Sequence, residues 1–265
     1  MGNSPFRNTK SLRDSSYDDG LAADTILAMS ILPRLLAIYQ DRGFAIRTGL
    51  NPAHFANHRE APFTVLWRGE EMLFGYGGLS LHEIMILEQV CALLDPRRIY
   101  IIGNAWGWST VALALMAPRA RIVAADPGEE VGAQLTERIA TEENLDVTVL
   151  RGPSPEVTSQ ALRTVGGDAF DLVLIDGEHQ NAAMIADFEG VLAHLDPRAL
   201  VICHDVIQHN LVNGIQGLRT RHDALGTFMF LERTASGMAI FAKPATPPEL
   251  IVYLACFRDP VAGLG

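Results

Sequence analysis

The chain has 265 residues, of which 48 % are hydrophobic and 20 % charged, a composition typical of a globular protein with a sizeable core. Its formal net charge is −10, from 21 basic and 31 acidic residues. Nucleic-acid binding needs clustered Lys and Arg. The basic residues here are scattered, so we exclude nucleic acid as the main partner. No apolar run approaches the roughly 18 residues that a membrane-spanning helix needs, so no membrane partner is expected.

The three cysteines, Cys91, Cys203 and Cys256, are far apart in the sequence. An odd number without close spacing argues against a disulfide framework or a zinc site and favours a reducing compartment. The first residues lack the apolar core of a secretory signal. We therefore expect a cytoplasmic protein.

The first part of the chain predicts a flexible arm followed by a cap. Residues 1–20 are polar and predict the arm. Residues 21–42 have apolar side chains at helical spacing, interrupted by Pro33. Residues 43–78 are rich in Gly and Pro, with "FTVLW" as a possible short strand. A connection this long tends to be functional, so residues 21–78 predict a helical and irregular cap over a substrate.

Strands and helices alternate regularly from Ser80, which predicts the N-cap of a helix over 80–94. The predicted strands are 98–103, 120–126, 146–152, 170–177 and 199–205, and the helices between them are 108–117, 128–145, 155–166 and 181–195. Such apolar strands are typical of a parallel sheet covered on both faces.

Two further strands, 226–232 and 237–243, are joined by a short connection and must be antiparallel. The predicted fold is therefore α/β, with a doubly wound, mostly parallel, seven-stranded Rossmann-like sheet and an antiparallel strand near one edge. The helical N-terminal cap precedes it. The extension 244–265 contains a short apolar helix, which could form a homodimer contact or pack on its own domain.

Polar or small residues follow each of the first five strands, at the sheet edge where doubly wound folds bind ligands. The turn "GNAWG" follows the first strand, and its glycines permit positive φ and close backbone approach. The helix entered at Ser109 has free amides that could hold an anionic group. Asp126 follows the second strand, where a carboxylate can accept both hydroxyls of a ribose.

The turn does not fit the commonest nucleotide motifs. Ala105 and Trp108 replace the second and third glycines of the dinucleotide fingerprint G-x-G-x-x-G, and no P-loop sequence follows. What remains suits a ribonucleoside without pyrophosphate but with a carboxylate-bearing tail. S-adenosylmethionine is such a molecule.

Residues 79–243 resemble the class I S-adenosylmethionine-dependent methyltransferases. The resemblance is greatest to the branch with catechol-type and caffeoyl-CoA-type O-methyltransferases, macrocin-type sugar O-methyltransferases and cephalosporin-hydroxylase-like proteins. "IIGNAWGWSTVALA" resembles the first motif of that branch, "FDLVLIDGEHQNAAMIADFEGVLAHLDP" the fourth-strand motif, with Asp187 in its helix, and "ALVICHDV" the fifth. Two positions depart from the pattern: Ile101 replaces an acidic residue, and Arg198-Ala199 replaces Gly-Gly.

The resemblance implies a cofactor site, a metal site and a catalytic residue. The implied S-adenosylmethionine site comprises Gly103, Asn104, Ala105, Gly107, Trp108, Ser109, Asp126, Pro127, Ser154 and Asp176. Catechol-type enzymes hold a divalent metal at positions that correspond to Asp176, His204 and Asp205. Mg²⁺ prefers oxygen ligands, whereas an imidazole suits Mn²⁺, Fe²⁺ or Zn²⁺ better. Either the metal is not Mg²⁺, or His204 is not a ligand.

His179, three residues after Asp176, is the candidate general base for a substrate hydroxyl; the alternative is that it only packs on the cofactor. Asp176 is the second predicted catalytic residue. Trp106 and Trp108 either line an aromatic substrate site or pack in the core. The predicted function is O-methylation of a small hydroxylated metabolite, as in secondary metabolism. The alternatives are a lyase or cyclisation reaction that uses the same cofactor, and a non-catalytic binding subunit.

Overall fold

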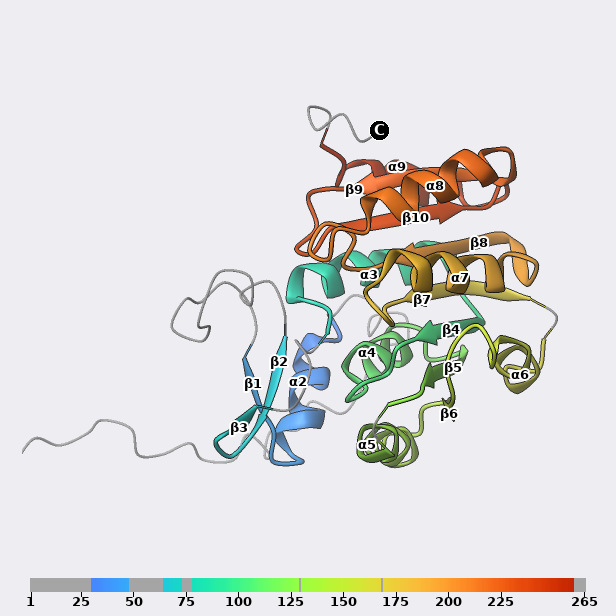
Figure 1. The fold of residues 1–265 in the computed structure, drawn as a ribbon. Helices are drawn as coiled ribbons and strands as arrows, with labels where there is room; N and C mark the ends of the chain where they lie inside the picture. The colour runs from blue at the N-terminus through green and yellow to red at the C-terminus, as the bar shows by residue number, and fades with distance from the viewer. Residues whose placement is uncertain (1–29, 48–63, 73–77, 129, 168, 260–265) are drawn as a thin grey trace, which may run out of the picture. The chain divides into compact units, whose positions relative to one another are not determined.

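The computed structural model describes residues 30–47, 64–72, 78–128, 130–167 and 169–259 (Figure 1). Contacts divide the chain after Ser30, and the elements below all belong to the unit Ile31–Gly265. The predicted arm at 1–20 lies outside the described residues, as do residues 21–29, 48–63 and 73–77 of the predicted cap. No helix in the described part of the chain is both long and apolar enough to cross a bilayer.

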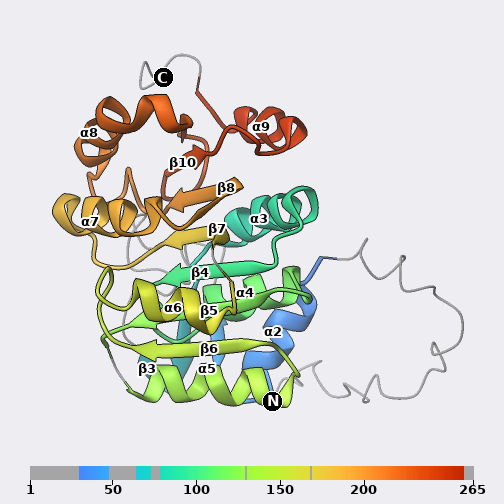
Figure 2. The same ribbon diagram turned by 90° about the vertical axis from the view of Figure 1, so that its right-hand side faces the viewer.

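A seven-stranded sheet with the order β6-β5-β4-β7-β8-β10-β9 forms the centre of the fold, and most of this order can be followed from bottom to top in Figure 2. The strands are β4 (Arg98–Ile102), β5 (Arg121–Asp126), β6 (Val147–Arg151), β7 (Phe170–Ile175), β8 (Leu195–Cys203), β9 (Thr227–Leu231) and β10 (Met238–Ala242). The first five pair in parallel, and β10 is antiparallel to both of its neighbours. The predicted fold class is confirmed.

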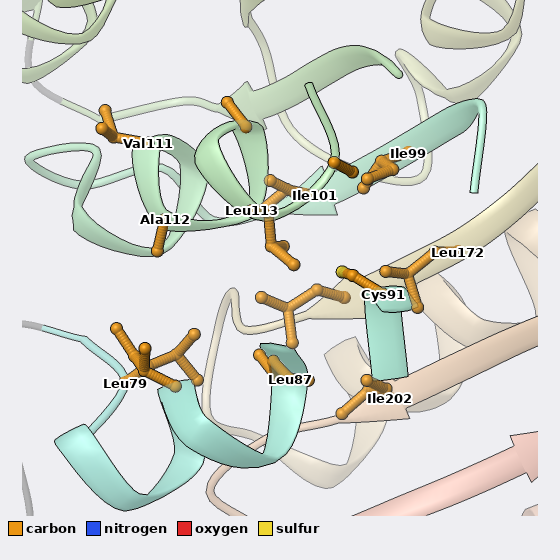
Figure 3. Close-up of a cluster of buried hydrophobic side chains, with 14 of the residues drawn as sticks. Leu79, Leu87, Cys91, Ile99, Ile101, Val111, Ala112, Leu113, Leu172 and Ile202 are labelled. Carbon is orange, nitrogen blue, oxygen red and sulfur yellow. The ribbon is translucent and has the colours of Figure 1, made fainter. Parts of the chain in front are cut away.

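Helices cover both faces of the sheet because its strands are apolar on both faces. In β4, Ile99 and Ile101 belong to one core cluster, whereas Tyr100 and Ile102 belong to the other. The first cluster includes residues of α3 (Leu81–Leu94), α4 (Trp108–Met116), α5 (Glu130–Glu142) and α9 (Pro248–Ala255). Figure 3 shows part of it, with Ile101 and Leu172 of the sheet near Leu87 and Cys91 of α3. The second includes residues of α6 (Thr158–Thr164), α7 (Asn181–Leu192) and α8 (Val212–His222).

The predicted start of α3 is confirmed. The Ser80 hydroxyl accepts a hydrogen bond from the Glu83 amide at 3.1 Å, and the Glu83 carboxylate accepts one from the Ser80 amide at 3.0 Å. This reciprocal capping box satisfies two amides that the first turn of a helix leaves unpaired. It also fixes the Glu83 side chain at the beginning of the helix.

Two local predictions need correction. The part of the predicted helix 21–42 that the structure describes contains α2 (Leu32–Gln40), and Pro33 lies in its first turn, where the missing amide costs nothing. The cap also contains a three-stranded antiparallel sheet of β1 (Ala45–Arg47), β2 (Val65–Arg68) and β3 (Glu71–Met72), of which only β2 was expected. Helix α7 ends at Leu192, because Leu195 already pairs with β7 as the first residue of β8.

Candidate functional site

A cavity of about 600 Å³ opens at the carboxyl ends of the parallel strands, and most of the predicted site residues line it. The ends of β4 and β5 contribute Gly103, Asn104, Ala105, Ser109, Asp126 and Pro127. The ends of β6, β7 and β8 contribute Ser154, Asp176, His179, His204 and Asp205. Residues from five strand ends therefore meet in one cavity of a size typical for small-molecule sites.

The turn after β4 passes very close to the end of β7. Gly103 has φ +98°, and a Cβ atom there would lie 2.0 Å from the carbonyl oxygen of Asp176. No residue with a side chain fits at this position without moving the backbone. Ile101, which replaces the motif's acidic residue, is buried in the core and so gives the cavity no carboxylate.

Asp126 holds this turn through backbone amides. Its Oδ2 atom accepts hydrogen bonds from the amides of Asn104 at 2.8 Å and Ala105 at 2.7 Å. Its Oδ1 atom accepts one from the Gly128 amide at 2.6 Å. The carboxylate shapes the turn before any ligand arrives, and its predicted contact with a ribose stays a prediction.

Gly107 and Trp108 are absent from the cavity lining, and their predicted contact with the cofactor stays a prediction. Gly107 faces α5, where a Cβ atom would lie 2.1 Å from Oγ1 of Thr136. Trp108 is 2 % exposed, and its indole Nε1 donates a hydrogen bond to the carbonyl of Leu79. Trp106 is half-buried against the core. These positions pack helices together, as the core alternative for the tryptophans predicted.

His204 is a buried cation between three carboxylates. Its Nδ1 atom lies 3.1 Å from Asp176 and 3.1 Å from Asp205, and its Nε2 atom lies 3.2 Å from Glu83. Burial disfavours charge on the ring, but the three carboxylates outweigh burial and raise its pKa well above the ordinary 6.5. At neutral pH both ring nitrogens therefore carry protons.

Asp176, His204 and Asp205 keep the spacing that the predicted metal site needs, because their ligand atoms lie within 4.8 Å of one another. A metal there would have to displace the proton on Nδ1 of His204, which lies 3.1 Å from both carboxylates. Metal binding at this cluster stays a prediction. A second cluster, formed by His179, Asp205 and His209, meets the same spacing, but there the Nε2 atom of His179 already pairs with Asp205 at 3.1 Å. We derive no chemistry through a metal at either cluster.

Glu83 is a member of the site region that the sequence analysis missed. Its side chain is fully buried, and besides His204 it accepts hydrogen bonds from the Ser236 amide at 3.1 Å and the Ser236 hydroxyl at 2.7 Å. Burial alone would raise the pKa of Glu83, but His204 and the hydrogen bonds lower it to about 2. The Ser80-x-x-Glu83 capping signal was visible in the sequence, whereas the partner from β8 was not.

His179 and Asp205 form a histidine–carboxylate pair that faces the cavity. The Nε2 atom of His179 lies 3.1 Å from Asp205 and 3.7 Å from Asp176, and its ring stacks on His209 with centroids 4.0 Å apart. Burial lowers the pKa of His179, but the two carboxylates outweigh it and raise the pKa to about 9. Once neutral, this imidazole can accept a proton from a ligand in the cavity and Asp205 can stabilise the resulting charge.

Comparison with known proteins finds a matching domain model and solved structures of similar fold. Residues 101–206, which include the turn and the end of β8, match the family model of a methyltransferase domain. The O-methyltransferase TomG from Streptomyces achromogenes, involved in tomaymycin synthesis and solved with SAM, is 22 % identical, and the match covers 63 % of this chain and 82 % of that chain with a TM-score of 0.51. An O-methyltransferase from Bacillus cereus in complex with SAH is 21 % identical over 63 % and 83 %, with a TM-score of 0.48.

The sequence matches none of the curated proteins. At such low identity the likeness to TomG concerns the fold, whereas the family model covers the motifs that line the cavity. The two findings agree with the strand order and with the resemblance seen in the sequence. Residues 101–206 thus match the model of a methyltransferase domain, and the chain shares the fold of TomG.

Proposed function

We propose that this enzyme transfers the methyl group of S-adenosylmethionine to a hydroxyl oxygen of a small metabolite. One observation carries the proposal: the His179–Asp205 pair and the glycine turn after β4 line the same cavity. Methyl transfer to oxygen needs both parts, a cradle for the cofactor and a group that removes the hydroxyl proton. TomG, which shares the fold, is an O-methyltransferase solved with SAM, and this supports the proposal.

The cofactor side of the site is formed by the turn and by the ends of β5 and β6. Gly103 and Asn104 would contact the methionine part, Asp126 the ribose, and Ser154 the base. When bound, S-adenosylmethionine supplies a methyl group that its sulfonium already activates. The protein's task is then to align the acceptor oxygen and to remove its proton.

His179 is the proposed base. In its neutral form it takes the proton of the acceptor hydroxyl, the oxygen gains the methyl group, and Asp205 stabilises the imidazolium that results. Asp176 lies against both His179 and His204, so it orients the pair. Side chains of the chain itself carry out each of these steps.

Calorimetric titration with S-adenosylmethionine and S-adenosylhomocysteine, in EDTA and again with Mn²⁺, tests the cofactor. We expect micromolar binding of both nucleosides that the chelator does not change. If neither nucleoside binds, the proposed function is wrong. If binding depends on Mn²⁺, the assignment of His204 as a buried cation is wrong.

The role of His179 is tested by His179→Ala with a panel of phenolic, sugar and hydroxy-acid acceptors. Removal of a general base typically costs about 10²- to 10⁴-fold in turnover, and we expect the affinity for S-adenosylhomocysteine to stay within a few-fold. His222→Ala is the matched control, because His222 pairs with Glu189 at 3.2 Å and lies away from the cavity lining. Equal losses of turnover and affinity in His179→Ala would instead make His179 a cofactor-binding residue.

A further inference from the structure

His179, Asp205 and His209 form a cluster of two imidazoles and one carboxylate on the wall of the cavity. The Oδ2 atom of Asp205 lies 3.1 Å from Nε2 of His179 and 3.7 Å from Nε2 of His209. The two rings stack with their centroids 4.0 Å apart and their planes 11° apart. One carboxylate oxygen therefore lies near two ring nitrogens, which come from the loops after β7 and β8.

The turn after β8 sets the positions of Asp205 and His209. The His209 amide donates a hydrogen bond to the carbonyl of Asp205 at 3.0 Å and closes a turn in which Asp205 has φ +58°. The Val206 amide donates to the carbonyl of Gly237 at 2.8 Å, in the loop between β9 and β10. This anchored turn returns His209 to the side of Asp205, so the backbone arranges the cluster before any ligand arrives.

The donor set of this cluster suits a particular class of ion. Two imidazoles and one carboxylate fit Zn²⁺, Co²⁺ or Ni²⁺, whereas Mg²⁺ and Ca²⁺ prefer oxygen ligands. Zinc binds imidazole nitrogen at about 2.0–2.1 Å, so two such ligands of one ion lie about 3 to 4 Å apart. The ligand atoms of the cluster lie within 4.8 Å of one another, and the His179 and His209 side chains are 35 % and 37 % exposed. Small rotations of the two rings therefore bring them to that spacing.

This cluster differs from the metal site predicted from the sequence, with which it shares only Asp205. The predicted site needs the Nδ1 atom of the buried His204, which lies 3.1 Å from Oδ1 of Asp205. The cluster with His209 uses Oδ2, the other oxygen of the same carboxylate. The contact between Asp205 and His204 can therefore stay as it is. An ion here has to displace only the proton on Nε2 of His179, at the cavity wall.

We propose that His179, Asp205 and His209 bind a divalent transition-metal ion such as Zn²⁺, and that the bound ion inhibits methyl transfer. The inhibition rests on the proposed function, because the ion occupies the nitrogen with which His179 accepts the proton of the acceptor hydroxyl. Ion binding does not rest on it, because the three ligands are present whatever the reaction. Zinc is then an inhibitor that a chelator removes.

The first measurement titrates the chelator-treated protein with Co²⁺, whose visible absorption reports four-coordinate binding, and then displaces Co²⁺ with Zn²⁺. We expect micromolar or tighter binding of both ions and no binding of Mg²⁺ at the same concentrations. Loss of a residue that merely supports a metal ligand costs about 10- to 100-fold in affinity, so His209→Ala should cost at least about 100-fold. His222→Ala is the matched control and should bind as the wild type does, because His222 pairs with Glu189 outside the cavity lining.

Asp176→Asn separates the two clusters, because Asp176 is a ligand only of the predicted one. Asp176 lies 3.7 Å from Nε2 of His179, so as a supporting residue it should affect the affinity for Zn²⁺ by no more than about tenfold. If Asp176→Asn loses as much affinity as His209→Ala or more, the ion belongs to the predicted cluster and the inference is overturned. It is also overturned if the wild type binds neither Co²⁺ nor Zn²⁺. In both cases the proposed function stands.

Turnover with and without Zn²⁺ tests the inhibition. Zn²⁺ at ten times its dissociation constant occupies about nine-tenths of the sites, so wild-type turnover should fall about tenfold and EDTA should restore it. His209→Ala should keep its own zinc-free rate at the same concentration. Unchanged or faster turnover of the wild type in Zn²⁺ would overturn the proposed inhibition. If no acceptor is methylated even without Zn²⁺, the proposed function has failed, and the affinities alone decide the inference.

Discussion

The two sides of the cavity satisfy their polar groups by opposite means. On the side of β4 and β5, the Asp126 carboxylate is held by three backbone amides. On the side of β7 and β8, the carboxylates of Asp176 and Asp205 face the imidazoles of His179 and His204. The first side is fixed by backbone geometry, and the second by charged side chains.

Under the proposed function, this difference separates cofactor binding from proton transfer. The partners of the Asp126 carboxylate are backbone amides, which do not titrate. The histidine–carboxylate side has pKa values moved far from the ordinary ones, as is typical of groups that take part in chemistry. Each side should therefore fail in a different way when it is altered.

Gly103→Ala should break the backbone side and have the largest effect. Positive φ costs an alanine about 1 kcal/mol, and overlap of its Cβ atom with the Asp176 carbonyl adds about 3 kcal/mol. Chemical denaturation should show the summed loss in the free energy of unfolding. Gly43→Ala is the control, because Gly43 has φ +81° and nothing within 4 Å of its Cβ position. Similar losses in both variants would mean that the close approach at Gly103 has no energetic weight.

Glu83→Gln should disrupt the charged side and lower the free energy of unfolding by less than Gly103→Ala does. Removal of one partner from a buried ion pair leaves the His204 charge uncompensated, and we expect about 3 kcal/mol. Glu189→Gln, which affects an exposed pair with Arg221 at 3.0 Å, should cost less than about 1 kcal/mol.

The loss of stability in Glu83→Gln should depend on pH. The pKa of Glu83 is lowered in the folded protein from 4.5 to about 2, so its contribution to stability is present above pH 4.5 and is lost as the pH falls to about 2. The stability difference between wild type and variant should shrink over that interval. A difference that stays constant down to pH 2 would contradict the buried ion pair.

The smallest expected effect is a shift in the pH profile of kcat/KM, which tests the charged side alone. If His179 is the base, kcat/KM should rise with pH to a plateau above about 9, because only the neutral imidazole accepts a proton. Asp205→Asn removes one of the carboxylates that raise the pKa of His179, so the midpoint should move to lower pH. An unchanged midpoint would show that another group limits the rate.

Most of the fold could be predicted from the sequence, because apolar runs and the Gly and polar residues that end strands are local signals. Gly103, Asp126 and Asp176 were located by their positions after buried strands, and the fold brings them into one cavity. Glu83 was missed because its capping signal is local, whereas its pairing with His204 depends on how α3 packs near β8. The bond between the Trp108 indole and Leu79 could not be predicted, because the motif gives only the order of residues and not which side of the helix faces the core.

The contacts of Tyr39 imply that α2 and the domain around the seven-stranded sheet unfold cooperatively. Tyr39 is fully buried, its hydroxyl donates to the carbonyl of Trp106 at 3.0 Å, and its ring lies 5.3 Å from that of Trp108. Detachment of α2 would leave a carbonyl of the glycine turn unpaired and would expose the indole of Trp108 to water. In hydrogen exchange, the amides of α2 should therefore be protected to nearly the same extent as those of α4, as parts of one foldon.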